Sequence, residues 1–274
     1  MRVGYLYVAN QKKFIDEAMI SSRSLRQFSE LPVALVCTQD IASKDVYAFF
    51  DEVIIHEEMK QYVYLSKVLG IQKSPFDRTI FLDTDTFICD DISPLFELLE
   101  LVDIATSIEK SYHTTDKINN IRFKNIIPEF NSGVIVYRKN EITQKLFKDW
   151  FQVCIDNRMG NDMPGLRESM IKNLKAVKFF ILPEEYNSHG YKSMLQLNGK
   201  VKVIHERLGV KWNSTTPYFL PYDKGEKFAK KINKTIFKRI YIPYIGIIPY
   251  NWSPANILLK LKKMIGVKRV SKNR

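Results

Sequence analysis

The sequence has few of the features that cross-link a small domain or anchor a chain in a membrane. Its three cysteines, Cys37, Cys89 and Cys154, lie far apart and form no C-x-x-C pair, which disfavours structural zinc and a disulfide framework and fits a reducing compartment. The sequence contains no run of 18 uncharged apolar residues, so no membrane span is indicated. No G-x-x-x-x-G-K run is present, which excludes a P-loop enzyme.

What the sequence does contain is an ordinary globular composition. The chain has 274 residues, of which 45% are hydrophobic and 26% are charged, enough to bury a core of its own. It opens directly on an apolar strand pattern without a signal-peptide cleavage region, so we expect a cytoplasmic protein.

Positive charge is concentrated at one end of the chain. Residues 223–274 contain 14 of the 42 lysines and arginines but only two of the 30 acids, and so carry the whole net charge of +12. The other 222 residues contain 28 bases and 28 acids and are neutral. A basic tail favours an anionic partner, such as a lipid surface or a nucleic acid.

The pattern within this tail favours the lipid surface. An Ile-, Tyr- and Trp-containing segment at 240–252 precedes an amphipathic, lysine-rich helix pattern that starts at Ser253, a combination typical of membrane interfaces. A helix packed on the body with its lysines in solvent is an equally good interpretation. A nucleic-acid partner is disfavoured, because no groove-reading or base-stacking module is recognisable. We therefore expect a cytoplasmic protein that can be peripheral on the inner face of the membrane.

Strand and helix patterns alternate over residues 1–222. Helix starts are indicated by Ser93 before Pro94, by Asn140 as an N-cap, and by Pro164. The alternation predicts an α/β domain with a mostly parallel sheet over 1–222, followed by a basic C-terminal extension at 223–274. The strand patterns fall at Val3–Val8, Leu31–Cys37, Glu52–Ile55, Thr79–Phe87, Val102–Ala105, Gly133–Tyr137, Lys178–Leu182 and Lys200–Ile204.

The most informative motif is an acidic pair at the end of one of these strands, Asp83-Thr84-Asp85. Because side chains two residues apart on a strand project to the same face, we expect Asp83 and Asp85 to point the same way. Two adjacent carboxylates repel each other unless a cation lies between them. A divalent cation bound there keeps open positions for phosphate oxygens, as a nucleotide-diphosphate substrate would provide.

The segment from Ser74 to Phe87 resembles the donor-binding region of GT-A-fold glycosyltransferases, in particular glycosyltransferase family 8 and its small bacterial and viral relatives. The resemblance covers about residues 1–212 and implies a Rossmann-like GT-A domain. Further segments agree with the family in the expected order: Tyr7-Val8-Ala9-Asn10, Phe130-Asn131-Ser132-Gly133-Val134, the stretch from Asp162 to Arg167, the stretch from Leu182 to Asn187, and the stretch from His205 to Trp212.

The resemblance also implies a set of site residues. His205 would join Asp83 and Asp85 as a metal ligand, and its nitrogen would favour Mn²⁺ over Mg²⁺. Asp162 would be catalytic, binding a sugar hydroxyl or steadying positive charge at the anomeric carbon. The implied donor-binding residues are Ala9, Asn10, Lys67, Thr84, Asn131, Gly133 and Lys211.

Ordinary structural roles stay open for several of these residues. Asn131 and Gly133 suit a turn before a strand, Asp162 suits a helix N-terminus, and the lysines suit a solvated surface. The chain also departs from the family pattern at two places. Met163 stands where many relatives have glutamine, and the closing element has an extra residue before Gly209 and lacks a proline.

The expected function is therefore metal-dependent transfer of a sugar from a nucleotide-diphosphate sugar, with UDP favoured, to a glycan or lipid-linked acceptor, with retention of configuration. One alternative is a haloacid-dehalogenase-type phosphatase, whose first aspartate is a nucleophile. That class is disfavoured because Phe87 stands where it has Thr or Val. The other alternative is a non-enzymatic basic binding protein that displays the tail.

Overall fold

The structure is a computed structural model, and it describes residues 1–109, 127–188, 195–197, 199–205, 222–233, 239–242 and 246–249. Its strands are β1 (Val3–Val8), β2 (Val33–Cys37), β3 (Glu52–Ile55), β4 (Arg78–Leu82), β5 (Thr86–Ile88), β6 (Ile104–Ile108), β7 (Phe130–Arg138), β8 (Phe179–Ile181), β9 (Leu195–Leu197), β10 (Val203–His205), β11 (Arg239–Ile242) and β12 (Gly246–Pro249). Its α-helices are α1 (Lys12–Leu25), α2 (Lys44–Phe49), α3 (Ser66–Ile71), α4 (Leu95–Leu98), α5 (Glu141–Asp156), α6 (Met163–Asn173) and α7 (Tyr222–Ile232). Short 3₁₀ helices occupy Gln39–Ile41, Glu57–Lys60, Val63–Leu65 and Glu184–Tyr186.

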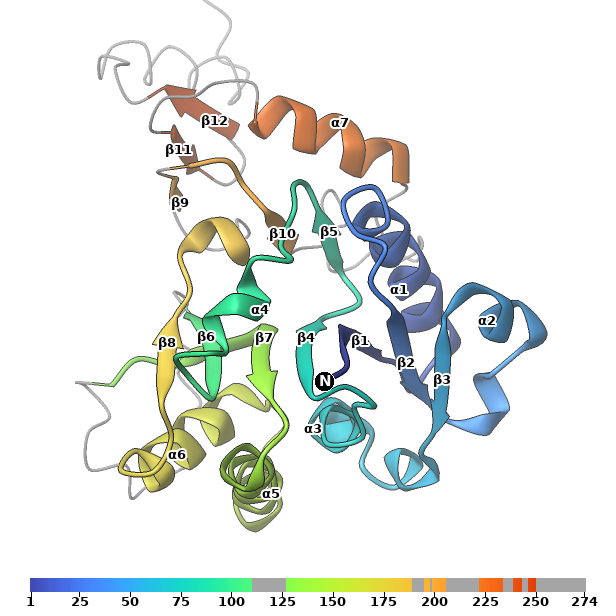
Figure 1. Cartoon of the computed structure of the whole chain (residues 1–274), viewed down its shortest axis with the longest axis vertical. Helices are drawn as coiled ribbons and strands as arrows, with labels where there is room; N and C mark the ends of the chain where they lie inside the picture. The colour runs from blue at the N-terminus through green and yellow to red at the C-terminus, as the bar shows by residue number, and fades with distance from the viewer. Residues whose placement is uncertain are drawn as a thin grey trace, which may run out of the picture.

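Seven strands form the central sheet, in the order β3-β2-β1-β4-β7-β6-β8 (Figure 1). Every neighbouring pair is parallel except the two that involve β7, which runs antiparallel to both β4 and β6. This confirms the predicted α/β domain with a mostly parallel sheet. The carboxyl ends of the six parallel strands therefore meet at one edge of the sheet, together with the start of β7. In open α/β sheets this is the edge where ligands bind.

The central strands read as continuous apolar runs because both faces of the sheet are covered. On one face, Tyr5 and Leu82 belong to a core cluster that includes residues of α1, α2 and α4. On the other face, Leu6 and Phe81 pack with residues of α3, α5 and α6. Successive residues of one strand thus alternate between two cores, as the period of a strand requires. Two buried faces hold β1 and β4 rigidly where their ends carry the site.

The helix starts differ in how well the sequence indicated them. Asn140 caps α5 as predicted: its side chain accepts a hydrogen bond from the backbone N–H of Thr143, and the Thr143 hydroxyl accepts one from the Asn140 N–H. The prediction of a Ser93 cap is wrong. Pro94 occupies the N-cap position of the short α4, and no side chain caps that helix.

The predicted strand Thr79–Phe87 is also wrong as one element. The chain leaves the central sheet after Leu82, makes a turn, and re-enters strand structure as β5. β5 pairs with β10 in a separate two-stranded antiparallel sheet, which Figure 1 shows beyond the end of β4. The apolar pattern continues through the break because Phe87 and Ile88 are buried in their new surroundings.

Part of the segment beyond residue 222 packs on the body. The Tyr222 ring at the start of α7 lies 5.7 Å from the Phe87 ring, and the Asn233 side chain bonds both the N–H and the C=O of Val201. β11 pairs with β9 and β12 in a three-stranded sheet. The amphipathic helix predicted from Ser253 lies outside the described residues. Within the described part of the chain, no helix is long and apolar enough to cross a membrane.

Candidate metal centre

The acidic pair lies on the turn between β4 and β5, at the carboxyl edge of the sheet. Asp83 extends the β4–β7 pairing by donating its N–H to the Gly133 carbonyl at 2.8 Å. Thr86 closes the turn, because its N–H and its hydroxyl both donate to the Asp83 carbonyl, at 3.2 and 2.8 Å. Asp83 and Asp85 do face the same residue, as expected, but it is this turn and not a strand period that aims them.

The small β5–β10 sheet brings His205 to the acidic pair. Its register sets His205 opposite Thr86, the residue directly after Asp85. The imidazole lies against Gly133, where an added Cβ would stand 2.0 Å from the ring atom Cε1. Only glycine leaves room for the ring at this point. We predicted a donor-binding role for Gly133, and the structure shows its contact with His205.

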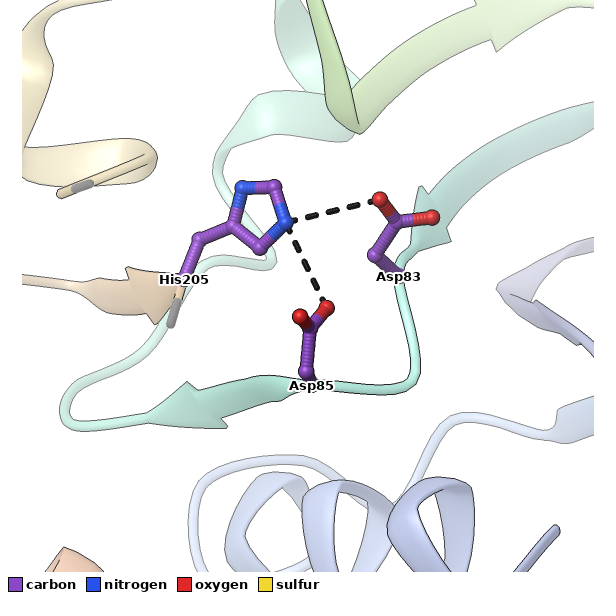
Figure 2. Close-up of side chains that lie close together, drawn as sticks. All are labelled: Asp83, Asp85 and His205. Carbon is purple, nitrogen blue, oxygen red and sulfur yellow. Dashed lines mark ion pairs between the residues drawn. The ribbon is translucent and has the colours of Figure 1, made fainter. Parts of the chain in front are cut away.

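Asp83, Asp85 and His205 form a cluster with the composition and spacing of a metal site. One ligand atom from each lies within 4.8 Å of the others. The His205 Nε2 atom is 3.4 Å from Asp83 Oδ2 and 3.4 Å from Asp85 Oδ1, as Figure 2 shows. These separations are close to the spacing of about 3 Å between adjacent ligands of an octahedral ion bound at about 2.1 Å. The three side chains therefore fit a divalent cation.

The charges of the cluster are strongly coupled. Burial alone would lower the pKa of His205, but the carboxylates of Asp85 and Asp83 outweigh it and raise the pKa to about 10. Burial likewise raises the pKa of Asp83, yet Lys67 and His205 hold it below its usual value. Without a metal the imidazole thus carries a second proton between the two carboxylates. A cation that takes the Nε2 lone pair replaces that proton.

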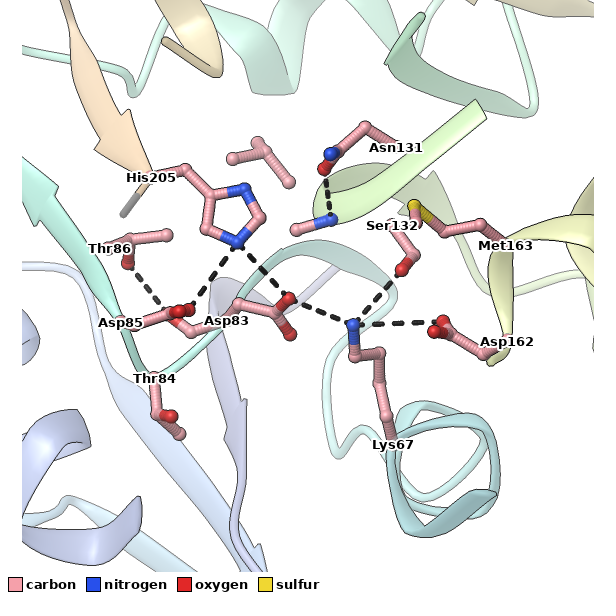
Figure 3. Close-up of polar contacts among 12 residues, drawn as sticks. Lys67, Asp83, Thr84, Asp85, Thr86, Asn131, Ser132, Asp162, Met163 and His205 are labelled. Atoms are coloured by element: carbon pink, nitrogen blue, oxygen red, sulfur yellow. Dashed lines mark hydrogen bonds and ion pairs between the residues drawn. The ribbon is translucent and has the colours of Figure 1, made fainter. Parts of the chain in front are cut away.

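Lys67 links this cluster to Asp162. It projects from α3, and its Nζ atom is 2.8 Å from Asp83 Oδ2, 3.0 Å from the Ser132 hydroxyl and 3.7 Å from Asp162 Oδ2 (Figure 3). Burial lowers the pKa of Lys67, but Asp162 and Asp83 outweigh burial and raise the pKa above its usual value. Lys67 therefore stays charged and is directed at the carboxylates rather than at solvent.

Asp162 immediately precedes α6 but does not cap it through its side chain. Its Oδ2 atom is buried and has no hydrogen-bond partner among the described residues, only the ion pair with Lys67. Met163, the departure from the family pattern, is the first residue of α6. Asp162 thus lies at the N-terminus of α6, as the structural alternative held, although its side chain pairs with Lys67 and does not cap the helix.

Asn131 lies inside β7, not in a turn before it as one interpretation held. The β6–β7 pairing shifts register between Thr106 and Ser107, which leaves Ser132, Gly133 and Val134 in a bulge at the edge of the cluster. The Asn131 amide is used within the protein: Nδ2 donates to Glu109, and Oδ1 accepts from the Gly133 N–H and from Asn187.

The remaining predicted donor-binding residues are placed as follows. Ala9 and Asn10 follow the carboxyl end of β1, the strand next to β4, and the Asn10 side chain donates to the Val63 carbonyl at 2.7 Å. The Thr84 side chain points away from His205 and donates to Glu17 Oε2 at 2.8 Å (Figure 3). Lys211 lies outside the described residues. Direct contact of these residues with a donor stays a prediction.

Sequence reasoning assigned no role to three residues that build the site. Ser132 binds Lys67, Asn187 binds the ring of His205 at 2.8 Å, and Glu17 holds the turn through Thr84. Ser132 and Asn187 belong to family-like segments, which was the available signal. Glu17 had none beyond its place as an acid on the apolar face of α1, where it is buried.

Taken together, the sheet order, the antiparallel β7 and the acidic turn at the carboxyl edge define a GT-A fold. No protein-family model matches the chain, and no curated protein matches it in sequence. Solved structures do match it, and those described below are glycosyltransferases.

The chain is similar to mouse xyloside xylosyltransferase 1, with a TM-score of 0.50 and 17% identity over 77% of this chain and 99% of that one. It is similar to the galactosyltransferase LgtC, crystallised with donor and acceptor sugar analogues, with a TM-score of 0.51 and 12% identity over 84% and 96%. It is also similar to the glycosyltransferase GlyE of Streptococcus pneumoniae TIGR4, with a TM-score of 0.55 and 15% identity over 85% of this chain and 65% of GlyE. At these identities the likeness shows the fold.

Proposed function

We propose that this protein is a metal-dependent glycosyltransferase that takes its sugar from a nucleotide-diphosphate sugar. The observation that carries the proposal is the convergence of Asp83, Asp85 and His205 at the carboxyl edge of a GT-A sheet. These ligand atoms come from the β4–β5 turn and from β10, two segments that only the fold brings together. Two carboxylate oxygens and one imidazole nitrogen suit Mn²⁺, with Mg²⁺ as the second choice.

Each side chain of the cluster has a chemical task in this proposal. When bound, the cation supplies Lewis-acid stabilisation of the charge on the departing diphosphate. Lys67 presents a permanent positive charge next to Asp83, where it offsets phosphate charge as well. Asp162 has a buried carboxylate oxygen beside Lys67, and we expect it to steady positive charge that develops on the anomeric carbon.

The finer parts of the proposal concern the donor, the acceptor and the stereochemistry. We favour a UDP-sugar, whose base and ribose would lie near Ala9 and Asn10, because these residues end the strand beside the metal site. The acceptor would be a glycan or a lipid-linked sugar. Retention of configuration rests on the resemblance to glycosyltransferase family 8, and proton NMR of the anomeric position of the product tests it.

The central experiment measures nucleoside diphosphate release. Purified protein is incubated with a panel of UDP- and GDP-sugars, with and without Mn²⁺. We expect Mn²⁺-dependent release from at least one donor, lost in the Asp83→Ala, Asp85→Ala double variant. Asp90→Ala is the matched control, because Asp90 lies on the same stretch of chain and pairs with Lys202 outside the cluster. Full activity of the double variant would refute the metal assignment. Phosphate release from p-nitrophenyl phosphate without any donor dependence would favour the phosphatase instead.

We propose in addition that the basic segment attaches the protein to an anionic membrane surface, which would place a cytoplasmic enzyme beside a lipid-linked acceptor. Supporting this are the net charge of +12 on residues 223–274 and the exposed lysines Lys224, Lys227 and Lys230 on α7. Flotation with neutral and anionic vesicles tests it. We expect recovery with anionic vesicles only, and equal recovery with both kinds would end the idea.

A further inference from the structure

A row of polar side chains, three of them buried, leads from His205 away from the metal cluster. Asn187 contacts the Nδ1 atom of His205 at 2.8 Å, Asn131 contacts Asn187 at 2.8 Å, and Glu109 contacts Asn131 at 2.6 Å. We infer that Asn187 is a positioning residue, which through this row fixes the imidazole tautomer that presents Nε2 to a metal. The inference rests on the proposed metal-dependent function and deepens it.

The direction of the row is set at Gly133. A backbone N–H can only donate, so the Asn131 atom that lies 2.8 Å from the Gly133 nitrogen must be the amide oxygen. The Asn131 nitrogen then faces Glu109, and a carboxylate is the acceptor that an NH₂ group needs. Both neighbours therefore demand the same orientation of the Asn131 amide.

This orientation passes to Asn187 and then to the histidine. The Asn131 oxygen also meets the Asn187 side chain, which must present its NH₂ group there. The Asn187 oxygen is consequently turned to His205 Nδ1, and an oxygen acceptor requires a proton on that nitrogen. In the neutral ring the remaining nitrogen, Nε2, is then the one with the lone pair, and it faces Asp83 and Asp85.

Burial makes this selection effective. Asn131, Asn187 and His205 are all at least 93% buried, so water does not compete for their hydrogen bonds. Gly133 lies against the ring and restricts its rotation. A metal-binding histidine with an oriented partner on its other nitrogen commonly loses about 10- to 100-fold in metal affinity when that partner is removed.

The test uses the full chain and Mn²⁺ alone, with free Mn²⁺ followed by electron paramagnetic resonance. We expect Asn187→Ala to weaken Mn²⁺ binding by about 10- to 100-fold. Asn173→Ala is the matched control, because Asn173 is equally buried but bonds Asp149 and Ser169. It should leave Mn²⁺ affinity unchanged. Asn187→Asp keeps an oxygen toward Nδ1 but sets a second oxygen against the Asn131 oxygen, so it should recover only part of the lost affinity.

A double-mutant cycle separates positioning from a general structural effect. In a His205→Ala background, Asn187→Ala should have no further effect on Mn²⁺ affinity, because it acts only through the imidazole. In Zn²⁺-loaded protein with ¹⁵N-labelled histidine, NMR should show the metal on Nε2 and the proton on Nδ1 of His205.

The failures are distinguishable. Wild-type affinity in Asn187→Ala, or an equal loss in the His205→Ala background, overturns the positioning role and leaves the proposed function standing. Failure of the unchanged protein to bind Mn²⁺ overturns both.

Discussion

The two edges of the central sheet use carboxylates in opposite ways. At the amino edge three acids each meet an arginine: Arg2 pairs with Glu52, Arg78 with Glu100 and Arg138 with Asp103. At the carboxyl edge, Asp83, Asp85 and Asp162 share Lys67 and His205 among the described residues.

Asp103 illustrates the saturated edge. Its Oδ1 atom accepts from the Arg138 and Asn140 side chains, and its Oδ2 atom accepts from the Lys178 N–H. Nothing in that network needs a further ligand. At the carboxyl edge, three carboxylates face only one permanent positive charge, that of Lys67. The positive charge on His205 comes from a second ring proton, which a cation can replace. A candidate metal site therefore differs from a structural ion pair in having more carboxylates, held in place by the fold, than permanent positive charges.

The largest effect is expected when the carboxylates of Asp83 and Asp85 are removed. Asp83→Asn together with Asp85→Asn keeps the side-chain volumes but removes both charged oxygen ligands. Mn²⁺ affinity should fall at least about a thousandfold, or roughly 4 kcal/mol. Calorimetric titration measures it, with Asp90→Asn as the control. If the Mn²⁺ affinity of the double variant were within tenfold of that of the unchanged protein, the carboxylates of the carboxyl edge would not be the metal ligands.

Gly133→Ala should come next, because the new Cβ would collide with the His205 ring. We expect the imidazole to be displaced and Mn²⁺ affinity to fall about 100-fold, near 2.7 kcal/mol. Gly160→Ala is the matched control, since a Cβ there meets nothing within 4 Å. Unchanged affinity in Gly133→Ala would show that the ring can find another position.

A change at the saturated edge should affect stability and leave the metal alone. Asp103→Asn should lower the free energy of unfolding by about 2–3 kcal/mol at pH 7, because it breaks a buried, charge-assisted network. Urea unfolding measures this loss, and Mn²⁺ titration should show no change. A metal affinity that fell in parallel would mean that the two edges are coupled.

The same variant has a predictable pH dependence. Burial raises the pKa of Asp103, but hydrogen bonds from the Lys178 backbone, Arg138 and Asn140 outweigh it and hold the pKa below its usual range. A carboxylate with a depressed folded-state pKa stabilises the protein above the unfolded pKa of about 4 and loses that contribution as the pH falls through the folded value. The stability difference between wild type and Asp103→Asn should therefore shrink below about pH 4.

The smallest effect is expected at Thr84, between the two aspartates. Thr84→Val removes the hydrogen bond to the buried Glu17 carboxylate and should cost about 1–2 kcal/mol of stability. Thr84→Ser keeps the hydroxyl and should cost less. Equilibrium unfolding of both variants decides this, and equal losses would show that the methyl group contributes as much as the hydrogen bond.

Much of the fold was predictable because it depends on local patterns. The apolar runs of β1, β2 and β4 and the Asn140 cap of α5 are short-range signals, and the structure confirms them. The break after Leu82 was not predictable, since Phe87 and Ile88 are as apolar as the residues before it. What makes β5 leave the sheet is its pairing with β10, more than 100 residues later in the chain.

The site divides in the same way. Asp83 and Asp85 are neighbours in sequence, so their common target could be predicted, although the turn that aims them could not. The chain of Asn131, Asn187 and Glu109 is invisible to sequence spacing, because its members are 22 and 56 residues apart. Asn131 therefore suggested a contact with a sugar, while the structure shows its amide turned toward other side chains.

The small β5–β10 sheet allows some loops of the chain to lengthen while the metal cluster keeps its geometry. Its register aligns the acidic turn with the histidine, and the two strands are joined by a long connection that starts after Ile88 and returns at Val203. New loops inserted into that connection, outside its strands, its helices and the segment that carries Asn187, would not shift the three side chains relative to one another. A scaffold of this kind can acquire new surfaces for new acceptors while the cation-holding corner stays where it was.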